Sequence, residues 1–182
     1  MAEVPVDKNL ERFAKKMSDL DELGNYILKG HLLVEEMVTR IVESFVFHRE
    51  FIDEARLTFH QKLQLARATS TSDHGNSMWG LISILNSLRN EMSHSLDRPK
   101  LQPKLDALRH KYFEEFPKES SSLSDEQVAL NAVLACMGFL SAHESEVERF
   151  RWWVEKLDRA INQNEDPAVI LKEIVGTNGG ND

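Results

Sequence analysis

The sequence is poor in residues that cross-link chains or interrupt helices. Its 182 residues include one cysteine, Cys136, with eight glycines and five prolines. A single cysteine excludes an internal disulfide framework, and long stretches without glycine or proline favour helices over sheets. No run approaches the roughly eighteen consecutive apolar residues that a membrane-spanning helix needs, so we expect no membrane contact. The first residues, MAEVPVDKNLERF, lack the apolar stretch of a signal peptide, and we expect a cytoplasmic protein.

Positive charge is also scarce, except in the middle of the chain. The 30 acidic and 22 basic residues give a net charge of −8, which argues against generic nucleic-acid binding. Residues 55–112, however, hold nine Lys or Arg and four Asp or Glu, a net of +5. Either these charges face different ways, or they form a local anion-binding surface. For the second case the candidate RNA-binding residues are Arg56, Lys62, Arg67, Arg98, Lys100 and Lys104.

Apolar residues recur at helical spacing along most of the sequence, and no strand pattern is apparent. We expect helices over 7–20, 21–48, 54–68, 77–96, 101–116, 125–142, 144–162 and 166–175, followed by a disordered tail at 176–182. Ser124 and Gln127 form a capping-box pattern at the start of the helix over 125–142. The pattern predicts one all-α domain spanning 1–182, built as a helical bundle.

The spacing also predicts the core. In the helix over 21–48 and the helix over 54–68, the expected core residues are Ile27, Leu33, Val34, Met37, Val38, Ile41, Val42, Phe45, Leu57, Leu63 and Leu65. Cys136 lies in the apolar segment NAVLACMGFL, and we expect it to be a small core residue.

The helix over 77–96 has two distinct faces when its residues are placed about 100° apart around the axis. The first is an apolar stripe of Leu81, Leu85, Leu88 and Met92. The second face contains no acidic residue and consists of Trp79, Ile82, Ser83, Asn86, Arg89, Asn90, Ser93 and His94. Such a face indicates either an internal helix covered by the C-terminal helices or a homodimer interface. We expect the interface, with Trp79, Ile82, Ser83, Asn86 and Ser93 in contact.

Arg89 and His94 are separated by about 140° on a straight helix, with Asn90 between them. A two-fold axis would bring an arginine and a histidine from each of two copies into one cleft. The simpler interpretation of His94 is a helix-terminal residue that the helix dipole favours.

The segment LRNEMSH resembles the signature of the HEPN superfamily, in which an arginine and a polar residue are followed, after three residues, by a histidine. GHLLVEEMVTRIV resembles the first long helix of these domains, FHQKLQLARA the second, and ISILNSLRNEMSHSL the signature helix. The resemblance covers about 22–116, and the helices over about 125–175 would be additions to a HEPN-type bundle. FHQKLQLARA is also similar to the mannitol operon repressor group, whose fold is related.

The HEPN resemblance implies a metal-independent endoribonuclease that works as a homodimer without a cofactor, in a toxin–antitoxin or phage-defence setting with an antitoxin or regulatory partner. It implies catalytic roles for Arg89, Asn90 and His94. Histidine titrates near neutral pH and arginine grips phosphate oxygens, so the residue types fit RNA cleavage. The remaining histidines show no metal-ligand spacing, and we expect no metal site. The resemblance to the mannitol operon repressor group favours the alternative, a non-catalytic regulatory or protein-interaction module.

Overall fold

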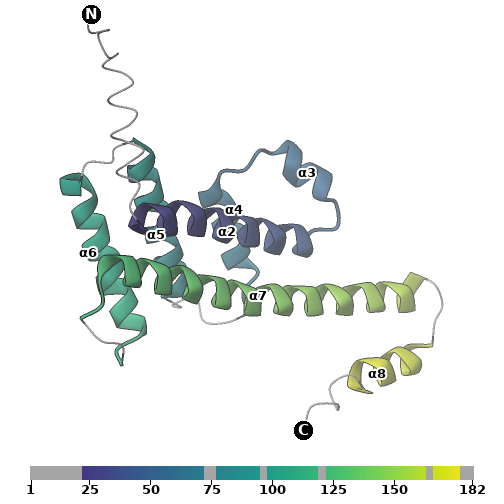
Figure 1. The fold of residues 1–182 in the computed structure, drawn as a ribbon. Helices are drawn as coiled ribbons and strands as arrows, with labels where there is room; N and C mark the ends of the chain where they lie inside the picture. The colour runs from purple at the N-terminus through teal and green to yellow at the C-terminus, as the bar shows by residue number, and fades with distance from the viewer. Residues whose placement is uncertain (1–21, 72–76, 95–97, 119–121, 163–165, 177–182) are drawn as a thin grey trace, which may run out of the picture. The chain divides into compact units, whose positions relative to one another are not determined.

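The computed structural model describes residues 22–71, 77–94, 98–118, 122–162 and 166–176. Figure 1 shows helices throughout this part of the chain, and none of these residues forms a strand. The elements are α2 (Glu22–Phe45), α3 (Arg49–Glu54), α4 (Phe59–Ala68), α5 (Met78–His94), α6 (Arg98–Glu115), α7 (Asp125–Asn162) and α8 (Pro167–Gly176). The predicted all-α class is confirmed. The helix predicted over 7–20 and the tail after residue 176 lie outside the described residues.

The chain groups into two compact units. The first comprises residues 1–38 and 71–140, and the second comprises residues 39–70 and 141–182. The boundaries between the two units at 38/39 and 140/141 fall inside α2 and α7, so each of these helices contributes to both units. The single domain expected from the sequence stays a prediction.

The core of the first unit centres on α5, which packs against α6. Leu81, Leu85 and Leu88 are fully buried and Met92 nearly so, which confirms the predicted apolar stripe. Cys136 of α7 is buried as expected, and burial raises the pKa of its thiol to about 12. The other core residues of α6 and α7 in this unit are Leu101, Leu105, Leu108, Tyr112, Val128, Ala129, Ala132, Val133 and Leu140.

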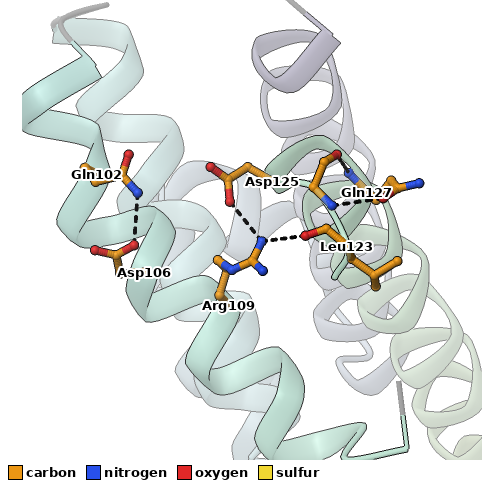
Figure 2. A network of polar contacts seen from close by, with 7 residues as sticks. Gln102, Asp106, Arg109, Leu123, Asp125 and Gln127 are labelled. Carbon is orange, nitrogen blue, oxygen red and sulfur yellow. Dashed lines mark hydrogen bonds and ion pairs between the residues drawn. The ribbon is translucent and has the colours of Figure 1, made fainter. Parts of the chain in front are cut away.

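The start of α7 is fixed by two sets of hydrogen bonds, which Figure 2 shows. The Gln127 backbone N–H donates to Ser124 Oγ at 3.3 Å, and the Ser124 backbone N–H donates to Gln127 Oε1 at 2.9 Å. The predicted capping box is therefore confirmed. Arg109 of α6 donates to the Leu123 carbonyl at 2.9 Å and to Asp125 Oδ1 at 3.0 Å, which ties α6 to this helix start.

The second unit is held by polar contacts between α7 and the segment 39–70. His143 of α7 is buried, and its Nε2 donates to the Ala66 carbonyl at 2.9 Å near the end of α4. Arg40 of α2 donates to Glu144 Oε1 at 2.8 Å. These two contacts come from neighbouring residues of α7, so one turn of this helix anchors both α2 and α4.

The helix predicted over 54–68 is wrong in its first third. α3 ends at Glu54, Arg56 adopts a positive φ of 47°, and α4 begins only at Phe59. Thr58 caps α4: the Gln61 N–H donates to Thr58 Oγ1 at 3.4 Å, and the Thr58 N–H donates to Gln61 Oε1 at 2.9 Å. A left-handed residue followed by a strong cap ends one helix and starts the next.

The predicted break between 142 and 144 is also wrong, because α7 is one helix of 38 residues. No proline interrupts this range, and its single glycine, Gly138, is tolerated within the helix. By length and composition α7 is the one described helix apolar enough to cross a membrane.

Three residues predicted for the core are exposed instead: Leu33, Phe45 and Leu65. The predictions for Ile27, Val34, Met37, Val38, Ile41, Val42 and Leu63 are confirmed, and Leu57 is half-buried. The errors lie at the edges of the apolar stripes, where spacing alone does not show how far the neighbouring helix reaches.

α2 and α7 approach each other closely at Gly30 in the first unit. A Cβ placed on Gly30 would lie 2.5 Å from Val133 Cγ2, whereas a Cβ on Gly138 would meet nothing within 4 Å. We expect Gly30→Ala to destabilise the protein by about 1–3 kcal/mol through overpacking. Gly138→Ala should stabilise it by about 0.5–1 kcal/mol, because alanine favours the helix without a clash.

Urea unfolding of both variants checks this prediction. The two changes in unfolding free energy should have opposite signs, so each variant is the control of the other. Adding Val133→Ala to Gly30→Ala should recover part of the loss. Stabilisation by Gly30→Ala would contradict the close approach of the two helices.

Candidate functional site

A buried histidine of α2 contacts the polar face of α5 within the first unit. His31 is only 1% exposed, and its Nε2 lies 3.0 Å from Asn86 Oδ1. Since the amide oxygen accepts, Nε2 carries the proton in this contact. His31 Nδ1 lies 3.7 Å from Glu35 Oε2, one turn further along α2. The histidine therefore joins an α2 carboxylate to an α5 amide.

The electrostatics around His31 favour its neutral form. Burial lowers the pKa of His31 below its ordinary value, and the positive charge of Arg89 adds to this lowering. The Glu35 carboxylate and the hydrogen bond to Asn86 act in the opposite direction but are smaller effects than burial. The influence of Arg89 on His31 connects this contact to the predicted catalytic arginine.

The predicted catalytic residues lie in the C-terminal half of α5. Arg89 Nη1 donates to Asn90 Oδ1 at 3.1 Å, and Ser93 Oγ donates back to the Arg89 carbonyl at 2.9 Å. Asn90, Ser93 and His94 are exposed, and Arg89 is half-buried. His94 is the last residue of α5. This half of the helix therefore presents an arginine, an amide and an imidazole to solvent.

The two large apolar side chains in the N-terminal half of the same face are buried, and here the sequence prediction needs correction. Trp79 is 3% exposed and Ile82 is fully buried. The Trp79 ring packs edge-on against Phe139 of α7, with 4.9 Å between ring centroids. The expected dimer contacts of Trp79 and Ile82 are therefore wrong. Both side chains belong to the core of the first unit, as the alternative of an internal helix covered by C-terminal helices required.

The remaining residues of the predicted interface are polar. Ser83 is exposed and its Oγ donates to the Trp79 carbonyl at 2.9 Å, while Asn86 binds His31. Ser93 binds the Arg89 carbonyl. A dimer contact on this face stays a prediction, but the face now lacks the apolar area that stabilises most interfaces.

The six predicted RNA-binding residues divide equally between the two units. In the second unit Lys62 donates to Thr39 Oγ1 at 3.1 Å, Arg56 is exposed and Arg67 is half-buried. In the first unit Lys104 donates to Ser87 Oγ at 2.6 Å and Lys100 is exposed. Arg98 opens α6, but its side chain lies outside the described residues. A single basic surface therefore stays a prediction.

Sequence reasoning did not place His31 in this site. It is 55 residues from Asn86, and no motif joins the two positions. The signal available was a histidine between apolar residues of a buried helix, which also fits a core role. Within the described residues, no group of three or more His, Cys, Asp or Glu side chains is placed to hold a metal ion.

Comparisons of the chain with protein-family models, with curated proteins and with solved structures find no match.

We predict that His31 makes the stability of the protein depend on pH. Its pKa is lowered in the folded state, so the unfolded state binds a proton first as the pH falls. The stabilisation is complete above the unfolded pKa of about 6.5 and is lost progressively below it. Thermal unfolding across this range should show a larger loss for the wild type than for His31→Gln, which does not titrate. Equal losses in the two proteins would contradict the prediction.

Proposed function

We propose that the protein is a metal-independent endoribonuclease of HEPN type, with Arg89, Asn90 and His94 at its catalytic site. The observation that carries the proposal is the hydrogen bond from Arg89 to Asn90, five residues before the exposed His94 on the open half of α5. Arginine and histidine together supply charge stabilisation and proton transfer, which are the two requirements of RNA cleavage by its own 2′-hydroxyl.

In the proposed reaction the 2′-oxygen gives its proton to a base and forms a bond to the adjacent phosphorus. The bond from phosphorus to the 5′-oxygen breaks, and that oxygen takes a proton from an acid. The products are a 2′,3′-cyclic phosphate and a 5′-hydroxyl. The imidazole of His94 serves as acid or base, while Arg89 stabilises the charge on the phosphorane oxygens.

Asn90 has a positioning role in this proposal. Its Oδ1 accepts from Arg89 Nη1 at 3.1 Å, which restrains the guanidinium and leaves its other N–H groups for phosphate. The neighbouring His31 is neutral near neutral pH and adds no positive charge that would compete with Arg89. The Glu35 carboxylate lies 3.7 Å from His31 Nδ1 and offsets only part of the effect of burial on the pKa of His31.

The separation of about 140° between Arg89 and His94 favours a site completed by a second copy. On one helix the two side chains project to different sides, whereas a phosphate must contact both groups within hydrogen-bond range. A two-fold arrangement supplies an arginine from one chain and a histidine from the other.

We expect Arg89→Ala and His94→Ala each to reduce RNA cleavage by roughly 10²-fold or more, as expected for removal of a charge-stabilising donor or a general acid–base. His60→Ala, which changes an exposed histidine of α4, is the matched control and should retain activity. Circular dichroism should show all three variants folded. Cleavage products from the wild type should carry a 2′,3′-cyclic phosphate and form in the presence of EDTA.

Mixing the two inactive variants tests the composite site. Partial recovery of activity is expected if an intact arginine and an intact histidine meet across two chains. Full activity in His94→Ala, or loss of activity on addition of EDTA, would contradict the mechanism. The alternative of a regulatory module, similar to the mannitol operon repressor group, would then be favoured.

A further inference from the structure

The exposed apolar side chains of the second unit form two adjoining features. The α7 stripe consists of Phe150, Trp153, Leu157 and Ile161, which lie within about 80° of one another around the helix. The aromatic groove is a cavity of about 440 Å³ whose lining includes Phe45, Phe47, Phe51, Phe150 and Val154. Phe150 belongs to both features, so they form one continuous surface.

The aromatic groove is built before any partner binds. Phe45 and Phe150 stack with 6.1 Å between ring centroids and 12° between ring planes. Arg151 donates to the carbonyls of Ser44 and Val46 at 3.2 and 3.1 Å, and its guanidinium lies 5.5 Å from the Phe47 ring centroid. These contacts fix the segment after α2 that carries the aromatic side chains. A preformed surface loses less conformational entropy on binding than a flexible one.

The amount of apolar surface suits a stable protein contact. The seven side chains Phe45, Phe47, Phe51, Phe150, Trp153, Leu157 and Ile161 are between 38% and 76% exposed. If each large side chain has roughly 150–250 Å² of surface, the exposed parts of these seven add up to about 700 Å² per chain. A specific interface buries about 800 Å² per partner, and monomers rarely expose a patch of this size.

We propose that this surface binds a second copy of the chain, with the α7 stripe of one copy packed against the α7 stripe of the other. The stripe positions carry no charge, and neither do Val154 and Ala160, which flank the stripe around the helix, so two identical stripes can meet without burying unpaired ions. A two-fold contact pairs a patch with itself, and an uninterrupted apolar stripe is complementary to its own copy.

Charges of both signs flank the surface. Exposed Glu50, Asp53, Glu155 and Asp158 alternate in sequence with exposed Arg49 and Arg149 and with half-buried Arg151 and Arg159. The surface between them is apolar, and an apolar surface suits a protein partner. The choice of a second copy also rests on the proposed function, because that function calls for two chains in one complex.

Sedimentation velocity of the full-length protein at micromolar concentrations tests the proposal. We expect the wild type at twice the chain mass of 20.9 kDa. The double variant Leu157→Glu with Ile161→Glu should dimerise at least about 30-fold more weakly, the scale of losing an interface hot spot. Both side chains are exposed in the single chain, so circular dichroism should show unchanged helix content.

Leu134→Glu is the matched control. It places the same charge on an exposed leucine of α7 in the first unit, outside the stripe, and should leave the dimer intact. A monomeric wild type, or a double variant that dimerises like Leu134→Glu, overturns the proposal.

Ribonuclease assays on the same samples separate this inference from the proposed function. A monomer that cleaves RNA in a His94-dependent way retains the ribonuclease activity, but it contradicts the composite site and overturns the α7 contact. A dimer that the double variant dissociates, but that leaves RNA intact, supports the α7 contact and contradicts the ribonuclease.

Discussion

The packing of Trp79 against Phe139 determines what the rest of α5 is able to do. This edge-to-face contact, with 4.9 Å between ring centroids, buries the N-terminal half of the second α5 face under α7. α6 packs against α5, and His31 of α2 reaches Asn86 one turn before Arg89. With these three neighbours in place, the arginine, amide and imidazole that α5 presents to solvent all lie in its C-terminal half. The proposed chemistry is confined to that half because the other half is core.

The sequence predicted the helices and the first α5 face well, since both depend on local periodicity. Leu81, Leu85, Leu88 and Met92 occupy the stripe that a 100° repeat assigns to them. The second face was harder, because a tryptophan and an isoleucine between serines fit a subunit interface and an internal contact equally well. Only the long-range position of Phe139 decides between these possibilities, and helical periodicity carries no information about it.

The residues of the candidate site also differ in whether local sequence or long-range packing reveals them. Arg89, Asn90 and His94 are recognisable because they fall within six consecutive residues. The contact of His31 with Asn86 joins positions 55 residues apart, and it follows from the packing of α2 on α5. The break between α3 and α4 does have a local signal in the sequence, which is a capping box. Thr58 and Gln61 form a capping box as regular as the one at Ser124, which was predicted correctly.

The burial of Cys136 gives this protein an intrinsic reporter of its own opening. The chain has one thiol, and its raised pKa of about 12 keeps it protonated, and therefore unreactive, while α7 stays packed in the first unit. When opening and closing are fast compared with modification, a thiol reagent reacts at a rate proportional to the fraction of molecules in which this core exposes Cys136. The kinetics of a single chemical modification become a measure of the local unfolding equilibrium of one unit, without any added label.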